Sequence, residues 1–332
     1  MHAIMFRRQG GPEVLESVDV PRPAPGPGEA LVRVTAAALN YSDVMRRRGD
    51  SYPFPTPLPF MPGSEMAGIV EALGEGVAAP AIGTRVFGAT GAGCHAEYVV
   101  APAAQLHAIP PGLDDGQAAG LIVAGGTAAL LLREAARLQQ GESIFIPAAT
   151  GGVGSYAVPL ARMMGAPRVI AGVGDAAKRQ AALALGASDV IDTSAPDWPA
   201  ALLAATGGQG VDVLLEMQGG QALEAGLAAL APFGRAIVFG KANMREAALG
   251  AAAQARLLYD PARNQSVQGF NLGGYIFQRP AALGAAMGAL LGGMMQGQVI
   301  PPRVTAMPLA SAADAHRLLE SRAVIGKLVL TP

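Results

Sequence analysis

Cysteine is almost absent from this chain. Its 332 residues include one cysteine, Cys94, so an intrachain disulfide framework and a structural zinc site built from several thiolates are both excluded. A reducing, intracellular environment suits this composition, and we expect a cytoplasmic protein. The sequence shows no general base near Cys94 and no second residue that would orient such a base. We therefore expect Cys94 to be a packing residue rather than a nucleophile.

Charge is also scarce. Charged residues make up 15% of the chain, and 24 basic against 25 acidic side chains give a net charge of -1. The longest basic run is Arg46-Arg47-Arg48, so nothing indicates a nucleic-acid partner. Hydrophobic residues reach 51%, which supplies a sizeable core and excludes a disordered polymer.

Long hydrophobic runs of the kind that span membranes are lacking as well. The first six residues are followed directly by Arg7 and Arg8, and no long apolar segment comes after them. This pattern does not match a signal peptide. The one uncharged stretch, 280–302, carries Gly284, Gly288 and Gly292 at the small-residue spacing of membrane helices. Because it is rich in alanine and glycine and ends in Pro-Pro, we expect a helix packed closely against a neighbour and no membrane span.

What is present divides the chain into three segments. Residues 1–122 read as β-rich, with alternating strands at Leu31–Val34 and Ile69–Leu73 between proline-rich loops. In residues 123–262 strands and helices alternate, which predicts a doubly wound parallel sheet. The expected elements there are a helix over Thr127–Leu138, a strand over Ser143–Pro147, a helix over Gly152–Met164, a strand over Arg168–Val173, a helix over Ala176–Leu185, strands at Val190–Ile191 and Val211–Leu215, a helix over Ala222–Leu230 and a strand over Arg235–Phe239.

The last segment, residues 263–332, has a mixed pattern. It ends in an expected helix over Ala310–Leu319 and an expected strand over Lys327–Leu330. We interpret this segment as a return to the first domain. The nucleotide-type domain would then be an insertion between two parts of the β-rich one.

A small-residue turn between the first of these strands and its helix is the strongest motif. It reads Ala149-Thr150-Gly151-Gly152-Val153-Gly154, a G-x-G-x-x-G pattern with alanine in its first position. The three small positions allow the tight turn, a close approach to a pyrophosphate, and close packing of helix on strand. The helix N-terminus adds free N–H groups and the positive end of its dipole. The motif predicts dinucleotide binding, although a purely structural turn is the alternative.

The end of the next strand selects the nucleotide. NAD sites usually place an acid there to bind the ribose 2′-hydroxyl, but this chain has Val173 at that position and Asp175 only later, in the turn. Lys178 and Arg179 follow, and either cation can pair with a 2′-phosphate. We therefore predict NADPH, against the alternative that both cations merely form a solvated helix face.

With these features in place, the chain resembles the medium-chain dehydrogenase/reductase superfamily over nearly its whole length. It is most similar to the zinc-free quinone oxidoreductase branch, which is related to enoyl reductases and the vesicle amine transport protein. The resemblance is carried by the glycine turn and by four further stretches: Asn40-Tyr41-Ser42-Asp43, Pro62 to Val70, Gly125-Gly126-Thr127-Ala128 and Val211 to Leu214. It implies a Rossmann sheet inserted in a GroES-like catalytic domain.

The resemblance also bears on metal chemistry. Zinc-dependent members carry Cys and His where this chain has Asn40 and Ser64, and a catalytic zinc needs three protein ligands. The four histidines are scattered without ligand spacing. We therefore expect no metal.

Without a metal, the acceptor must be easily reduced, and donors must stabilise the negative charge that hydride addition places on its oxygen. The resemblance implies Asn40 and Tyr52 as the residues facing the nicotinamide, with Tyr41 as a neighbouring candidate. The alternatives are a strand-end cap for Asn40 and a loop tyrosine packed on prolines for Tyr52. Asp43 and Glu65 fit a structural role better than proton chemistry.

Several more cofactor contacts are implied by the same resemblance. Besides the glycine turn and Lys178, they are Thr127, Gly174, Thr193, Phe239, Gly240, Phe270, Asn271 and Leu272. The chain departs from its relatives at Glu216-Met217-Gln218, where Asp-Ser-Val is more usual, and at Cys94-His95. Because of these departures, the resemblance does not predict which residues line the substrate pocket.

Three functions remain possible at this point. The first is an NADPH-dependent reductase of a quinone or another activated enone, the second a 2-enoyl thioester reductase, and the third an NADPH-binding protein with little turnover. We also expect a homodimer, because the segment from Ser266 to Phe270 resembles the sheet edge through which relatives pair.

Overall fold

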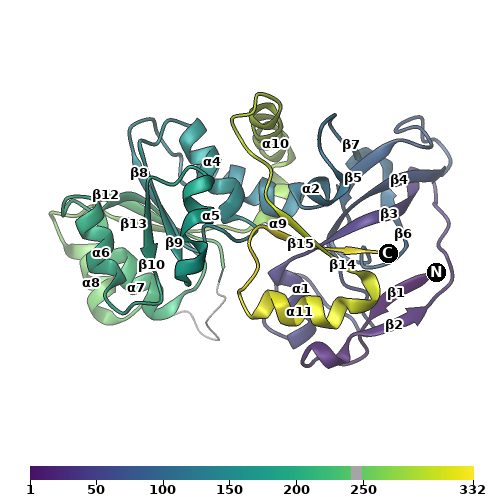
Figure 1. Ribbon diagram of the computed structural model, residues 1–332, viewed down its shortest axis with the longest axis horizontal. Helices are drawn as coiled ribbons and strands as arrows, with labels where there is room; N and C mark the ends of the chain where they lie inside the picture. The colour runs from purple at the N-terminus through teal and green to yellow at the C-terminus, as the bar shows by residue number, and fades with distance from the viewer. Residues whose placement is uncertain (241–248) are drawn as a thin grey trace. The chain divides into compact units, whose positions relative to one another are not determined.

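The computed structural model describes residues 1–240 and 249–332, which form two compact units (Figure 1). The first unit comprises Met1–Ala124 and Pro302–Pro332, and the second comprises Gly125–Pro301. The second unit is therefore inserted in the first.

The first unit is built on a mostly antiparallel sheet of order β14-β15-β3-β4-β5-β7, with β6 paired to β3. A separate antiparallel pair joins β1 and β2. The strands are β1 His2–Met5, β2 Glu16–Asp19, β3 Glu29–Leu39, β4 Glu65–Leu73, β5 Arg85–Ala89, β6 Tyr98–Pro102, β7 His107–Ala108, β14 Val304–Pro308 and β15 Lys327–Thr331; the α-helices are α1 Tyr41–Arg48, α2 Asp115–Ala119 and α11 Ala312–Glu320.

Two features of this unit follow from its sequence. The predicted strands at Leu31–Val34 and Ile69–Leu73 are parts of the longer β3 and β4, whose small and β-branched residues line one core with Val86 and Val99. The C-terminal segment joins the unit because β15 pairs with β3 in antiparallel register, Leu328 opposite Leu39.

The second unit contains a six-stranded sheet of order β10-β9-β8-β11-β12-β13. Every pairing in it is parallel, which confirms the predicted Rossmann-type sheet. Its elements are α3 Gly126–Leu130, β8 Ser143–Ile146, α4 Gly154–Met163, β9 Arg168–Val173, α5 Arg179–Ala184, β10 Asp189–Asp192, α6 Trp198–Ala205, β11 Val211–Glu216, α7 Gly220–Ala228, β12 Leu230–Val238, α8 Ala251–Tyr259, β13 Ser266–Gly269, α9 Leu272–Gln278 and α10 Pro280–Met295.

Helices cover both faces of this sheet (Figure 1). The chain runs outward from β8 through β9 to β10 and then crosses to β11 on the other side of β8. Right-handed crossovers therefore place α4 and α5 on one face and α6 and α7 on the other. A cluster around Phe145, Ile170, Leu202, Leu214 and Leu227 fills the space beneath α6 and α7.

The boundary of the second unit differs from the predicted one at residue 262. The unit continues to Pro301, because β13 pairs in parallel with β12 and α10 packs against α3. Strand pairing between distant segments decides this, and the mixed sequence pattern after residue 262 did not reveal it.

The helix expected over Thr127–Leu138 is also divided differently. The chain forms a π-type turn over Leu121–Gly125, then the short helix α3, then a second π-type turn over Leu131–Ala135. Among the described residues, no helix combines the length and apolarity that crossing a membrane requires.

The uncharged stretch from residue 280 forms α10, but its three spaced glycines are not the contact. Its buried residues are Ala286, Leu290 and Gly293. A Cβ added at Gly284, Gly288 or Gly292 would meet no described atom within 4 Å apart from its chain neighbours and the adjacent backbone of its own helix. The expected packing of this helix against a neighbour is confirmed, since α10 packs on α3, but the contact is made by other residues than the three spaced glycines.

This orientation predicts a gain in stability from Gly288→Ala. An exposed glycine inside a helix costs about 0.5–1 kcal/mol relative to alanine, because it loses more backbone entropy on folding. Chemical denaturation should show a free energy of unfolding higher by about that amount. Gly293→Ala is the matched comparison and should destabilise, because its Cβ would lie 2.6 Å from Met163 Sδ. Equal effects of the two changes would contradict this orientation of the helix.

Candidate functional site

The carboxyl ends of the six parallel strands gather the predicted cofactor residues. Parallel strands all end at the same edge of a sheet, and ligands of such sheets bind outside that edge. The glycine turn follows β8, Gly174 follows β9, Thr193 follows β10, Phe239 follows β12 and Phe270 follows β13. The fold thus brings together residues that are up to about 120 positions apart.

The glycine turn has the geometry its small residues predict. Its first position, Ala149, donates its N–H to Gly172 O at 3.0 Å, which fastens the turn to β9. A Cβ on Gly154 would lie 2.5 Å from Ala148 O and 2.6 Å from Ala149 Cα, so only glycine allows the helix to approach the strand so closely. The first i→i−4 bond here runs from Ser155 N to Gly151 O at 2.9 Å. The N–H groups of residues 152–154 therefore lie at the N-terminal end of the helix, ahead of its first i→i−4 bond, which is the arrangement that suits an anion.

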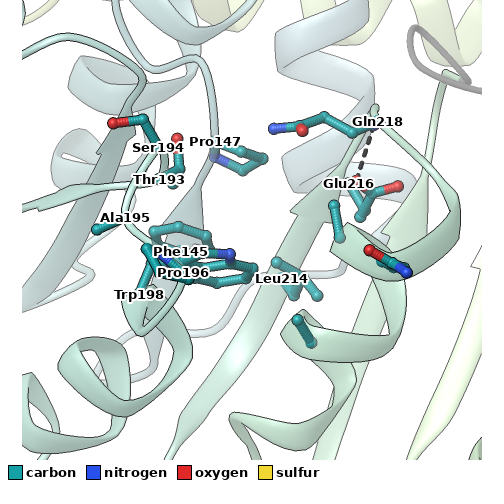
Figure 2. A pocket seen from close by; sticks show the side chains of 13 residues that line it. Phe145, Pro147, Thr193, Ser194, Ala195, Pro196, Trp198, Leu214, Glu216 and Gln218 are labelled. Carbon is teal, nitrogen blue, oxygen red and sulfur yellow. Dashed lines mark hydrogen bonds between the residues drawn. The ribbon is translucent and has the colours of Figure 1, made fainter.

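A pocket of about 340 Å³ opens beside this turn, between the first turns of α6 and α7 (Figure 2). It lies where the strand order reverses, between β8 and β11. Its apolar wall includes Phe145, Trp198 and Leu214, and the first two rings stack at 5.5 Å with 15° between their planes. Gln218 and Thr193 are among its polar groups, on opposite sides of the pocket.

Glu216, the last residue of β11, shapes the polar side of this pocket. Its carboxylate accepts N–H bonds from Gln218 at 2.7 Å and from Gly219 at 2.9 Å. Burial raises the pKa of Glu216, and these backbone donors oppose the rise. Glu216 is one of the departures from the relatives noted above, where aspartate is more usual. Its longer side chain accepts hydrogen bonds from the backbone of the loop that follows it.

At the end of β9, the position where an NAD site would carry an acid is filled by Val173, which is buried. Asp175 instead caps the following turn, accepting the N–H of Ala177 at 2.8 Å. Lys178 is half-buried, and desolvation lowers its pKa against the opposing effect of Asp175. Arg179 is exposed, and its Nη1 donates to Val190 O at 3.0 Å.

Of the remaining predicted cofactor residues, those after β12 and β13 lie on the other half of the same edge, whereas Thr127 lies in α3. Phe239 is held by its N–H bond to Glu216 O at 2.9 Å, ahead of Gly240, and Phe270 by its bond to Val238 O at 2.8 Å. Asn271 accepts the N–H of Gly273 at 2.8 Å and so caps α9, which begins at Leu272. Thr127 is buried in α3, which packs against α4 and α9.

In the first unit, Asn40 lies between the end of β3 and the start of α1. Its side-chain Nδ2 donates to Glu65 Oε1 at 3.0 Å, and its Oδ1 accepts from Lys327 Nζ at 2.8 Å. Its backbone N–H donates to Asp43 Oδ2 at 2.9 Å, and the other oxygen of Asp43 accepts from Gly63 N. Asp43 and Glu65 therefore hold backbone and amide groups in place, as their expected structural role requires.

Tyr52 lies in the proline-rich loop after α1 and is half-buried. Burial raises its pKa, and the positive charge of Arg46 opposes the rise. The Arg46 guanidinium lies 5.3 Å from the Tyr52 ring centre and donates to Pro55 O at 2.7 Å and Gly91 O at 2.8 Å. Arg46 thus fixes the loop that carries Tyr52. Tyr41, the first residue of α1, accepts from Arg48 Nη1 at 3.3 Å.

Sequence reasoning missed several residues of the pocket and one buried residue of the first unit. Trp198 is the only tryptophan in the chain and begins the helix after β10, two signals that could have marked it. Lys327 was assigned only to a strand, and nothing in its neighbourhood along the chain points to Asn40 or Glu65. Among residues 1–240 and 249–332, no cluster of three or more His, Cys, Asp or Glu side chains is placed to hold a metal ion.

Two family models match this chain. The alcohol dehydrogenase GroES-like domain matches residues 26–111, and the zinc-binding dehydrogenase model matches residues 152–286. The two matches fall in the first and second units respectively.

Known proteins similar to this chain fall into several functional classes. A mycocerosic acid synthase-like polyketide synthase of Mycobacterium tuberculosis is 34% identical over 98% of this chain, but the chain spans only 15% of that protein's length. The human synaptic vesicle membrane protein VAT-1 homolog is 32% identical over 330 residues, covering 96% of this chain and 82% of that protein.

A solved structure matches over the full length. Escherichia coli quinone oxidoreductase, crystallised in complex with NADPH, superposes with a TM-score of 0.90 at 32% identity, and the match covers 100% of both chains. With both domain models in the expected order and relatives above 30% identity over nearly full lengths, the chain belongs to the medium-chain dehydrogenase/reductase superfamily, as a quinone oxidoreductase-like member.

Proposed function

We propose that the second unit binds NADPH along the carboxyl edge of its sheet. The observation that carries this proposal is the turn at Gly151–Gly154. There Gly154 lets the helix pack closely on the strand, and the N-terminus of the helix would bind the pyrophosphate. The pocket beside it is large enough for a purine ring, with Trp198 as an apolar wall and Gln218 as a polar group. Gly174 and Lys178 take the ribose 2′-phosphate, and Thr193 borders the base.

The same proposal gives the nicotinamide end to the other half of the edge. Phe239, Gly240 and the segment Phe270–Leu272 lie after β12 and β13, where they can hold the carboxamide, and Thr127 contacts the ring. The E. coli relative was crystallised with NADPH, which supports this choice of nucleotide.

We further propose that the chain reduces quinones. Bound NADPH would supply a hydride, which carries two electrons, to the acceptor and would become NADP⁺, and one proton from solvent would complete the hydroquinone. The protein's part is to orient the acceptor and to stabilise the charge that develops on its oxygen. Asn40 supplies an amide donor and Tyr52 a hydroxyl donor, with Tyr41 as the neighbouring candidate.

A second candidate is the reduction of a 2-enoyl thioester. It is favoured by the polyketide synthase relatives, which match 98% of this chain within a much longer protein. The hydride then adds to the β-carbon of the conjugated double bond, the negative charge collects on the thioester oxygen, and a proton is added at the α-carbon.

One assay panel separates the candidates. The purified chain is mixed with NADPH and, in parallel, with a benzoquinone, a crotonyl thioester and a simple enone, and the loss of nicotinamide absorbance is followed. Turnover of the benzoquinone with the largest kcat/KM supports the leading proposal. Turnover of the thioester alone overturns it in favour of the second candidate. If NADPH binds and no acceptor is reduced, the chain is a nucleotide-binding protein of another class.

The nucleotide preference has its own test in Lys178→Ala. Loss of one charge-assisted bond to the 2′-phosphate, worth about 1.5 kcal/mol, should lower the NADPH/NADH ratio of kcat/KM about tenfold. Arg179→Ala is the matched control, because that guanidinium is tied to Val190 O, and it should change the ratio less than threefold. An unchanged ratio in the Lys178 variant would remove that residue from the phosphate site.

We also propose a homodimer formed through β13. This strand lies at the edge of the sheet, and its residues are exposed, as are the large side chains of Phe233 and Tyr259. A second copy could extend the sheet by edge pairing. Val267→Pro would remove a ladder donor, so light scattering at micromolar concentration should change from the mass of a dimer to that of a monomer. A monomeric unmodified chain would refute this proposal.

A further inference from the structure

Three strands of the first unit bring one lysine into a buried polar cluster. β15 pairs with β3, and β3 pairs with β4, so the first residues of β15 and β4 meet at the end of β3. Lys327 Nζ lies 2.8 Å from Asn40 Oδ1, 3.2 Å from Leu39 O and 3.5 Å from Glu65 Oε1. Its side chain is 4% exposed, and that of Glu65 is fully buried.

This cluster fixes the orientation of the Asn40 amide. A lysine ammonium can only donate hydrogen bonds, and an ionised carboxylate can only accept them. With Lys327 on one side and Glu65 on the other, Oδ1 must face the ammonium and Nδ2 the carboxylate. The reverse orientation would set a donor against a donor and an acceptor against an acceptor. One N–H of Nδ2 is donated to Glu65, and the other is the donor that the proposed function assigns to the acceptor oxygen.

The charges of the cluster depend on each other. Burial raises the pKa of Glu65, while Lys327, the N–H of Val123 and the Asn40 amide act against the rise. Val123 N donates to Glu65 Oε2 at 2.7 Å, so both carboxylate oxygens are bonded. An ammonium bonded to the amide oxygen also polarises the amide and strengthens its N–H donors.

The same residues are a poor fit for zinc, although the family model that matches residues 152–286 is named for zinc. Position 40 supplies an amide that is already bonded at both ends, and position 64 supplies a serine. Glu65 remains as the one anionic ligand, whereas a zinc site needs three protein ligands. A divalent ion bound to that carboxylate would also lie close to the ammonium, and the two charges would repel each other.

We propose that the Lys327 ammonium is the charge that organises this cluster for the reaction. Lys327 is a positioning residue. It holds Glu65 ionised, sets the direction of the Asn40 amide and increases the donor strength of that amide toward the acceptor oxygen. This inference rests on the proposed reductase function, and its tests include two that do not depend on turnover.

The first test compares Lys327→Met with the double variant Lys327→Met/Glu65→Gln. The single change leaves a buried carboxylate without its countercharge, so Tm should fall by several degrees and kcat for the benzoquinone by at least about tenfold. The double change removes both charges and should recover most of the Tm while kcat stays low. The Kd for NADPH, measured by fluorescence, should stay within about twofold in both variants. Recovery of kcat together with Tm would show a merely structural role and overturn the proposal.

The second test uses nitrogen NMR of lysine side chains. The chain contains only three lysines, Lys178, Lys241 and Lys327, so ¹⁵N-lysine labelling gives resolvable ammonium signals. One ammonium signal should exchange slowly with water and disappear in the Lys327→Met variant. In Asn40→Ala the same signal should shift or broaden. If all three ammonium groups exchange rapidly in the unmodified protein, the buried cluster does not exist in solution.

The third test adds Co²⁺, a spectroscopic substitute for zinc, to the unmodified protein. We expect that the protein does not bind Co²⁺ stoichiometrically. We also expect no visible absorption band of tetrahedral Co²⁺. Binding of one Co²⁺ per chain that Glu65→Gln abolishes would overturn the proposal. Failure of every acceptor in the assay panel would end the reductase proposal alone, because the NMR and Co²⁺ results would still decide whether the ammonium occupies this cluster.

Discussion

Replacing Gly154 by alanine should weaken NADPH binding by at least about 100-fold. The new Cβ would lie 2.5–2.7 Å from three backbone atoms of Ala148 and Ala149. Backbone cannot move aside as a flexible side chain can, so α4 must shift away from β8. That shift displaces the N–H groups that would hold the pyrophosphate, and several charge-assisted bonds of about 1.5 kcal/mol each are weakened together. Isothermal titration calorimetry with NADPH measures the change.

The matched control for this change is Gly288→Ala, which adds the same methyl group where no described atom lies within 4 Å. Its Kd for NADPH should equal that of the unmodified chain. Circular dichroism should show that the Gly154 variant keeps its helix content, so that lost binding is not lost folding. A folded Gly154→Ala protein that binds NADPH within threefold of normal would show that the nucleotide does not use this turn.

Mild acid should destabilise the first unit through two buried histidines. His316 of α11 lies against His95, with ring centroids 6.5 Å apart, and near the guanidinium of Arg47 in α1. Burial and these two neighbours lower the pKa of His316 to about 2. Burial also lowers the pKa of His95, with Lys327 acting in the same direction and Asp43 against it.

Whether stability rises or falls with pH depends on how many protons the folded and unfolded states bind. Unfolded histidines titrate near pH 6.5, whereas the folded ones stay neutral well below that pH. The contribution of each to stability is therefore fully present above about pH 6.5. It is lost as the pH falls below that value, at about 1.4 kcal/mol per pH unit for each histidine. Urea denaturation between pH 7 and pH 5 should show this slope.

The variant that tests the assignment is His316→Leu. Neither ring nitrogen of His316 has a hydrogen-bond partner among the described residues, so leucine should cost little at pH 7 and should reduce the slope by about 1.4 kcal/mol per pH unit, the share of one histidine. An unchanged slope in the His316 variant would place the acid sensitivity elsewhere.

Much of the second unit could be predicted from local patterns. Strand β9 has the predicted bounds, and α4 starts two residues later than expected, because a buried apolar strand and a glycine turn are each specified by adjacent residues. The glycine turn could be assigned without any tertiary information, since its small residues are required by a strand-to-helix bend. The site residues after β12 and β13 came from the family resemblance instead, and their roles remain predictions.

Other features depended on contacts between distant parts of the chain. The strand β13 has no buried residue, so its short, polar sequence does not reveal that it completes the sheet. The glycines of α10 share a spacing with helix interfaces, but only the position of the neighbours decides which face is buried. The residues that line the pocket could not be predicted from the sequence either, because their side chains come from β8, β11, α6 and α7, which are far apart along the chain.

The sequence by itself determined the glycine turn, the absence of an acid at Val173 and the alternation of strands and helices in the second unit. Each of these depends on residues next to one another along the chain. Only the tertiary structure placed Lys327 beside Asn40 and Glu65, 287 and 262 positions away. Cross-strand neighbours are set by sheet register, and register is decided by the packing of whole strands rather than by the residues that happen to meet.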